Sequence, residues 1–223
     1  MSNKGSRQTT VTIVLAALFS ALAYLTVFIF RVPIIPAVGF LKYEAKDAVL
    51  ALEALILGPI PAACSSFVIS LIEMVTVSTT GPIGAVMNFL SSMAFVLPVG
   101  IIYSKKRTLS AAVIGLACAV VSETVIMLLW NYLISPIYMG ISREAIVELL
   151  LPGFLPFNAI KSLINAALTF ILYKPLITVL RKAGLLPKRD DAVGSKTLPL
   201  VINVVCILLI VAAVLAIVVF KIV

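Results

Sequence analysis

Three polar side chains share one stripe of an apolar segment that begins near Pro156 and runs to about Val179. Asn158, Lys161 and Asn165 have spacings of three, four and seven residues, which place them on one face of a helix. An ammonium group inside a membrane costs roughly 2.5–3.5 kcal/mol on insertion scales, so this face needs a polar partner. That partner is either a neighbouring helix or interface reached by snorkelling, or a bound ligand.

The loop of residues 31–46 is rigid and apolar. Two prolines oppose a helix there, while Phe40, Leu41 and Tyr43 are too apolar for an ordinary linker. This loop either covers a pocket as a lid or packs at the membrane interface.

Composition indicates an all-α polytopic membrane protein. Hydrophobic residues make up 62% of the 223-residue chain and the mean hydropathy is +1.22. The net charge of +8 comes from Lys and Arg between the apolar segments, which indicates membrane topology rather than nucleic-acid binding.

The apolar segments predict a six-helix bundle over residues 1–182, a polar linker at 183–197 and an additional C-terminal transmembrane helix at 198–223. A loop with a short surface helix is expected at 135–150, and Asp47 is a candidate N-cap of the short second span. The expected spans of the bundle are 9–30, 47–57, 62–78, 85–103, 109–134 and 156–179.

Most Lys and Arg fall on one side of these spans, and the positive-inside rule then places the N-terminus in the cytoplasm of a cell-membrane protein. Asn88, Asn131, Asn158 and Lys161 gather toward the outer face in that orientation. A solute arriving from outside would meet them there.

Several kinds of chemistry lack their residues. The chain has no histidine, which excludes Ser-His triads and His-ligated metals, and its three cysteines have no paired spacing. No phosphate-binding GxxxxGK[ST] loop occurs, so the chain is not expected to be an enzyme or to hydrolyse ATP alone. Glu73 and Glu123 could carry protons in a secondary transporter of a small organic solute, and a scaffold without a ligand is a third possibility.

Four motifs in this order resemble the riboflavin-specific S-components of energy-coupling-factor (ECF) transporters. They precede the second span, open the fourth, close the fifth and open the sixth. The motifs are Phe40–Glu44, Gly81–Gly84 leading to Asn88, Asn131-Tyr132 and Pro156–Lys161. The resemblance covers about residues 9–182, so it provides no counterpart for the seventh span.

The resemblance implies a subunit that captures riboflavin near the outer face, with no cofactor of its own. Asn131, Asn158 and Lys161 would hold the isoalloxazine ring, and the loop around Lys42 and Glu44 would close over it. Carboxamides suit the alternating donors and acceptors of the ring's pyrimidine edge, and Tyr132 could add to the apolar walls. The expected binding residues are Phe40, Leu41, Lys42, Tyr43, Glu44, Asn88, Asn131, Asn158, Lys161 and Asn165.

The resemblance also implies partners. An S-component works with a transmembrane T-component and two ATPase subunits. Ala17 and Ala21, four residues apart on the first span, would form the surface that docks on the T-component. On spacing alone, packing against helices of the same chain is the commoner outcome for such a pair.

Overall fold

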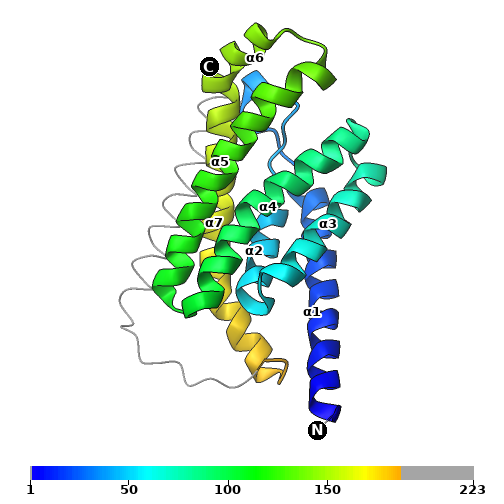
Figure 1. Ribbon diagram of the computed structural model, residues 1–223, viewed down its shortest axis with the longest axis vertical. Coiled ribbons are helices and arrows are strands. Elements are labelled where there is room, and N and C mark those ends of the chain that lie inside the picture. Colours follow the sequence, from blue (N-terminus) through cyan, green and yellow to red (C-terminus); the bar gives the residue numbers. More distant parts are fainter. Residues whose placement is uncertain (1, 187–223) are drawn as a thin grey trace.

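The computed structural model describes residues 2–186. The predicted seventh span at 198–223 and all but the first residues of the predicted linker at 183–197 lie outside the described residues. The described chain is helical apart from its turns and a loop between the first two helices (Figure 1). The α-helices are α1 (Ser2–Ile29), α2 (Lys46–Leu57), α3 (Pro59–Thr76), α4 (Gly81–Lys106), α5 (Leu109–Met139), α6 (Arg143–Leu149) and α7 (Leu155–Lys182).

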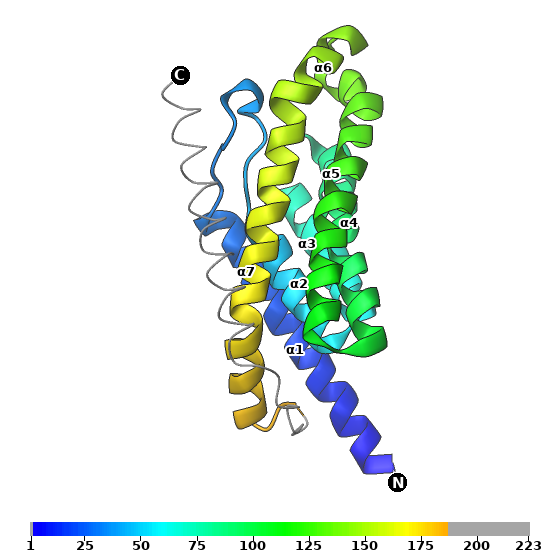
Figure 2. The same ribbon diagram turned by 90° about the vertical axis from the view of Figure 1, so that its left-hand side faces the viewer.

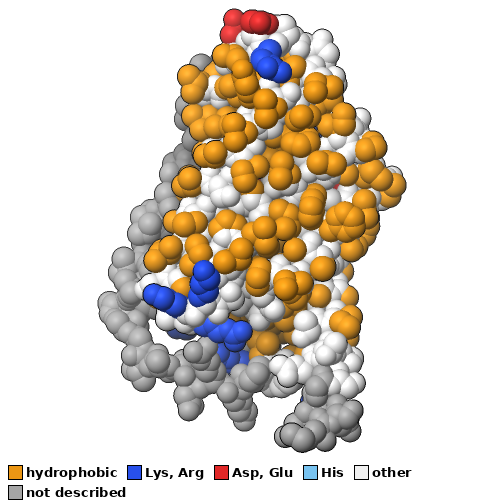
Figure 3. Space-filling view, in the orientation of Figure 1, with side chains coloured by type: hydrophobic (Ala, Val, Ile, Leu, Met, Phe, Trp, Pro, Cys, Tyr) orange, Lys and Arg blue, Asp and Glu red, His pale blue; other side chains and the backbone are white. Residues whose placement is uncertain are grey.

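The predicted fold class is confirmed. Five segments of the described chain are long and apolar enough to cross a membrane, and α2 adds a sixth, shorter helix to the bundle. The short surface helix is present as α6, and a π-helical turn at Leu150–Phe154 joins it to α7. Apolar side chains cover the middle of the molecule, while charged side chains lie toward its two ends (Figure 3). This distribution suits a chain surrounded by lipid.

Two boundary predictions were wrong. Asp47 does not cap α2, because the N-cap is Ala45 and the Asp47 carboxylate instead accepts a hydrogen bond from Ser92 Oγ at 2.5 Å. The fifth helix does not stop at residue 134 but continues through Pro136 to Met139. Proline is tolerated inside membrane helices because neighbouring groups can satisfy the backbone carbonyl that it leaves free.

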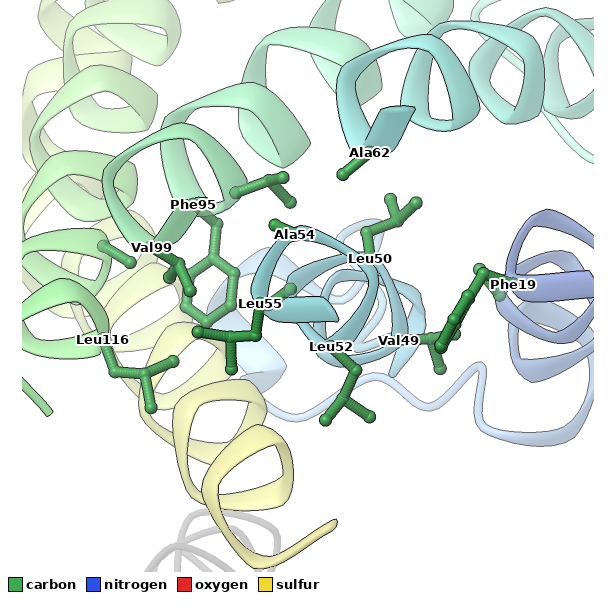
Figure 4. Packing of buried hydrophobic residues seen from close by; sticks show 14 of the residues in the cluster. Phe19, Val49, Leu50, Leu52, Ala54, Leu55, Ala62, Phe95, Val99 and Leu116 are labelled. Carbon is green, nitrogen blue, oxygen red and sulfur yellow. The ribbon is translucent and has the colours of Figure 1, made fainter. Parts of the chain in front are cut away.

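Helix α2 lies at the centre of the bundle. All ten residues from Lys46 to Leu55 are buried, as expected for a helix enclosed on every side. Figure 4 shows α2 side chains such as Leu50 and Leu55 packed among Phe19 of α1 and Phe95 of α4. The central helix therefore contributes to one continuous apolar core with its neighbours.

The bundle has two chemically different ends (Figure 2). The loop end carries α6 and residues 30–45, whose arms are joined by backbone hydrogen bonds in both directions between Val32 and Tyr43. The basic end carries the N-terminal part of α1, the α4–α5 turn and the C-terminal part of α7. Its cations include Lys105, Lys106, Arg107, Arg181 and Lys182.

Gly100 allows the turn between α2 and α3 to pack directly against α4. A methyl group at this position would come within 2.8 Å of Pro59 Cβ and 3.0 Å of Pro59 Cα. We expect Gly100→Ala to destabilise the protein by about 1–3 kcal/mol, because the backbone must move to relieve the overlap. The measurement is the thermal unfolding midpoint of the purified protein.

Gly39→Ala is the matched control, because a methyl group there meets its nearest neighbour, Pro36 O, at an ordinary 3.6 Å. A midpoint for Gly100→Ala that equals that of Gly39→Ala would contradict the proposed close contact.

Candidate functional site

A cavity of about 140 Å³ lies toward the loop end, and its walls come from α1, α2, α3, α4, α5, α7 and the loop of residues 30–45. Residues that are distant in the sequence and that we singled out as binding residues meet here. Those that line the cavity are Phe40, Leu41, Lys42, Glu44, Asn88, Asn131, Asn158 and Lys161.

Lys161 lies in the cavity wall and links three helices. Its Nζ lies 2.9 Å from Asp47 Oδ2 of α2 and 2.8 Å from Glu123 Oε1 of α5. It also donates to Ser91 Oγ of α4 at 2.9 Å. The lysine is only 8% exposed, so the two carboxylates supply the negative charge that a buried ammonium requires.

A second ion network also contributes to the wall of the cavity. Lys46 Nζ donates to both carboxylate oxygens of Glu73, at 2.8 and 2.6 Å. Asn88 Nδ2 also donates to Glu73 Oε2 at 2.8 Å, which fixes the asparagine against α3. The Glu44 carboxylate lies 3.7 Å from Lys46 Nζ and 3.3 Å from Arg31 Nε. Burial raises the pKa of Glu44, and the neighbouring Lys46 acts in the opposite direction.

The carboxamides of Asn131 and Asn158 are held in place by their own helices. Asn131 Nδ2 donates to Met127 O at 2.7 Å, and Asn158 Nδ2 donates to Phe154 O at 2.8 Å. Each amide nitrogen carries two N–H groups, so one donor of each residue remains for another acceptor. Both side chains line the cavity, which gives it fixed, uncharged hydrogen-bonding groups.

Tyr43 and Asn165 lie outside the cavity lining and instead connect the loop to α7. The Tyr43 hydroxyl donates to Asn165 Oδ1 at 3.1 Å, and Asn165 Nδ2 donates to Glu44 O at 3.4 Å. Burial raises the pKa of the Tyr43 phenol, so its hydroxyl keeps the proton that it donates. These contacts fasten the base of the loop to α7. Tyr132, the other expected wall residue, also lies outside the lining, and the Arg143 guanidinium stacks 5.1 Å from its ring centre.

Sequence analysis missed the partners of the buried charges. Lys46 was treated as a loop residue and Asp47 as a cap, whereas both point into ion pairs. The available signal was that Lys46 and Asp47 are adjacent and come directly before ten mostly apolar residues. A charge at the start of such a helix needs a partner if the helix is buried, because it cannot reach water. Arg31 gave no comparable signal.

Ala17 and Ala21 are both exposed on α1. They therefore do not pack inside the described bundle, and together they form a small-residue surface on its outside.

A model of the family described as "ECF transporter, substrate-specific component" matches residues 11–173. Similar proteins include the riboflavin transporter RibU of Staphylococcus aureus (strain TCH60), which is 27% identical over 74% of this chain and 90% of its own length. The riboflavin transporter FmnP of Bacillus subtilis (strain 168) is 26% identical over 77% of this chain and 96% of its own length.

A solved structure described as the S component of a bacterial ECF transporter has a similar fold. The TM-score is 0.65, the sequence identity is 26%, and the match covers 76% of this chain and 97% of the other. The likeness thus includes nearly the whole of that S component.

Lys161 should be essential for stability because it neutralises two buried carboxylates. We expect Lys161→Met to destabilise the protein by about 3–5 kcal/mol, the usual cost of leaving buried charges unpaired. Adding Asp47→Asn and Glu123→Gln should restore most of the loss, since the uncompensated charges disappear. The thermal unfolding midpoint measures both effects.

Lys42→Met is the control, because Lys42 lines the same cavity but is exposed. If the triple variant were no more stable than Lys161→Met, unpaired charge would not be the cause of the instability.

Proposed function

The chain belongs to the family of ECF transporter substrate-specific components, and we propose that it captures riboflavin in the cavity at its loop end. The observation that carries this proposal is the convergence of Asn131, Asn158 and Lys161 from two helices on one cavity. The names of the related riboflavin transporters support the same substrate.

The charges of the cavity favour an uncharged substrate. Arg31, Lys46 and Lys161 line it, and each already has a carboxylate partner. A phosphate group would have to break one of these pairs to gain a buried cation, at a cost of several kcal/mol. Riboflavin has no phosphate, so its ring can accept hydrogen bonds from the free N–H groups of the carboxamides, and from the Lys161 ammonium in place of Ser91 Oγ, without disturbing the pairs.

The size of the cavity indicates that the loop moves when the substrate binds. The free space of about 140 Å³ is smaller than typical pockets for drug-sized ligands, which are about 300–1,000 Å³. The base of the loop is fastened by the Tyr43 hydrogen bond, whereas farther along the loop the contacts are apolar, with Val38 against Gly153 and the Phe40 ring against Phe154. We propose that the tip swings outward to admit the ring and then covers it.

Transport would require further subunits. We propose that the exposed surface of Ala17 and Ala21 docks on a T-component, and that two ATPase subunits supply the energy. The cations at the basic end favour a cytoplasmic position for that end and for the N-terminus of a cell-membrane protein. The substrate cavity then opens toward the outside.

The buried ion pairs argue against the rival proton-coupled transporter. Glu73 is bound by Lys46 and Glu123 by Lys161, so protonating either carboxylate would leave a buried ammonium without part of its countercharge. Uptake that depends on a proton gradient and not on ATP would favour the rival.

Riboflavin binding should depend on Asn158. We expect Asn158→Ala to weaken binding at least about tenfold, because the carboxamide contributes a donor and an acceptor to the ring. Titration of the purified protein, followed by quenching of flavin fluorescence, measures this loss.

Ser162→Ala is the matched control: Ser162 is also buried on α7, one turn further along, and donates only to backbone carbonyl groups. Equal affinities of Asn158→Ala and the control would remove Asn158 from the site. Wild-type protein that binds no riboflavin would overturn the proposed substrate.

Capture and docking should be separable on α1. We expect Ala17→Trp or Ala21→Trp to abolish riboflavin uptake by cells that supply the partner subunits, and to leave binding by the purified protein unchanged. The reason is that both alanines face outward and neither lines the cavity.

Leu22→Trp provides the control, since Leu22 is exposed on another face of the same helix. Equal loss of uptake in Leu22→Trp would show that bulk anywhere on α1 is harmful and would contradict a specific docking surface.

A further inference from the structure

The basic end contains a second and larger cavity. Its volume is about 620 Å³, and it lies between the N-terminal part of α1, the last residues of α2, the end of α4 and the end of α7. The two cavities adjoin opposite ends of α2: Lys46 lines the first, and Leu55 and Leu57 line the second. Nothing in the capture of a solute at the loop end uses this space.

The short length of α2 explains why the space exists. Twelve residues of α-helix extend about 18 Å, whereas the hydrocarbon core of a bilayer is about 30 Å thick. The chain turns back at Gly58 into α3, so α2 fills the centre of the bundle only over part of its depth. Beyond that turn the neighbouring helices enclose a cavity instead of packing on a sixth helix.

The walls of this cavity combine aliphatic side chains with positively charged ones. Val11, Leu15, Leu55 and Ile177 are among the aliphatic side chains that line it. Three guanidinium groups also line it, those of Arg7, Arg107 and Arg181. Arg7 belongs to α1, Arg181 belongs to α7, and Arg107 is the residue that ends α4.

Arg107 is held at the cavity by an unusual backbone conformation. Its φ is +46°, in the left-handed region, and it ends α4 by donating its N–H to Tyr103 O at 2.8 Å. Glycine normally takes this position, and another residue there costs free energy. The strain coincides with an arginine in the lining of a cavity, which is the pattern expected where a side chain serves a ligand.

We propose that the basic-end cavity binds an anionic phospholipid of the surrounding leaflet. The headgroup phosphate would lie among the guanidinium groups of Arg7, Arg107 and Arg181, and an acyl chain would follow the aliphatic walls. Arginine pairs well with phosphate through two parallel N–H donors, and basic pockets between membrane helices on the cytoplasmic side commonly take acidic headgroups.

The aliphatic walls decide between a lipid and a water-soluble anion. A free phosphate would use the arginines but would leave the aliphatic part of this cavity of about 620 Å³ unfilled. A phospholipid matches both parts of the lining, and it reaches the cavity from the membrane in which α1 and α7 already lie. This inference concerns a different cavity from the riboflavin site and stands without it.

The test is native mass spectrometry of the full chain, released from detergent micelles that contain equal amounts of phosphatidylglycerol and phosphatidylcholine. We expect the wild type to retain phosphatidylglycerol preferentially. Arg7→Gln/Arg107→Gln should reduce that retention about tenfold, because two of the three phosphate ligands are lost. Circular dichroism and elution as a single species verify that the variant is folded.

Lys105→Gln/Lys106→Gln is the matched control, since it removes the same charge from exposed residues beside Arg107 that do not line the cavity. The control should retain phosphatidylglycerol like the wild type. Equal loss in both variants, or equal retention of the two lipids by the wild type, would overturn the site. Complete displacement of the lipid by excess inorganic phosphate would show a free-phosphate site and overturn the lipid assignment.

Discussion

The charges at the start of α2 organise this bundle. Lys46 and Asp47 are adjacent, so their side chains leave the helix in different directions, one toward Glu73 of α3 and the other toward Lys161 of α7. Neither residue is more than 2% exposed. Because an unpaired charge in this environment is costly, α3, α4 and α7 must present polar groups to the first turn of one buried helix, and α5 supplies Glu123 to Lys161. The loop-end cavity forms beside this point.

The same constraint explains why the cavity is pre-formed. The charged partners bind one another, and the asparagines bind carbonyl groups of their own helices. Polar side chains in the wall are therefore oriented before a ligand arrives, and a neutral ring need not pay for ordering them. The loop is held differently, because hydrogen bonds through Tyr43 and Asn165 fasten its base to α7, whereas its middle packs through apolar side chains such as Val38. The walls and the loop that we propose as a cover thus come from separate parts of the chain.

Sequence patterns predicted the helices well where hydrophobic runs were long, as in α4 and α5, because the membrane requires every backbone polar group to be satisfied within the segment. They also indicated that Asn131, Asn158 and Lys161 share an outer cluster. Pairing could not be predicted: the sequence does not contain the rotation of one helix against another, and that rotation decides that Lys161 meets Asp47 and Glu123. The same uncertainty placed Asn165 in the pocket, although it lies one turn too far along α7 to line it.

The short α2 links the two ends of the molecule. Its N-terminal charges define the loop-end cavity, and its early C-terminal end leaves the basic-end cavity open. A longer α2 would carry the apolar core toward the basic end and fill the space that Arg7 and Arg107 now line. A shorter one would separate Lys46 and Asp47 from the packing that keeps them dry, because the residues after them supply the centre of the apolar core. The length of this one helix therefore shapes both cavities, the one in which we propose that a solute is held and the one in which we propose that a lipid binds.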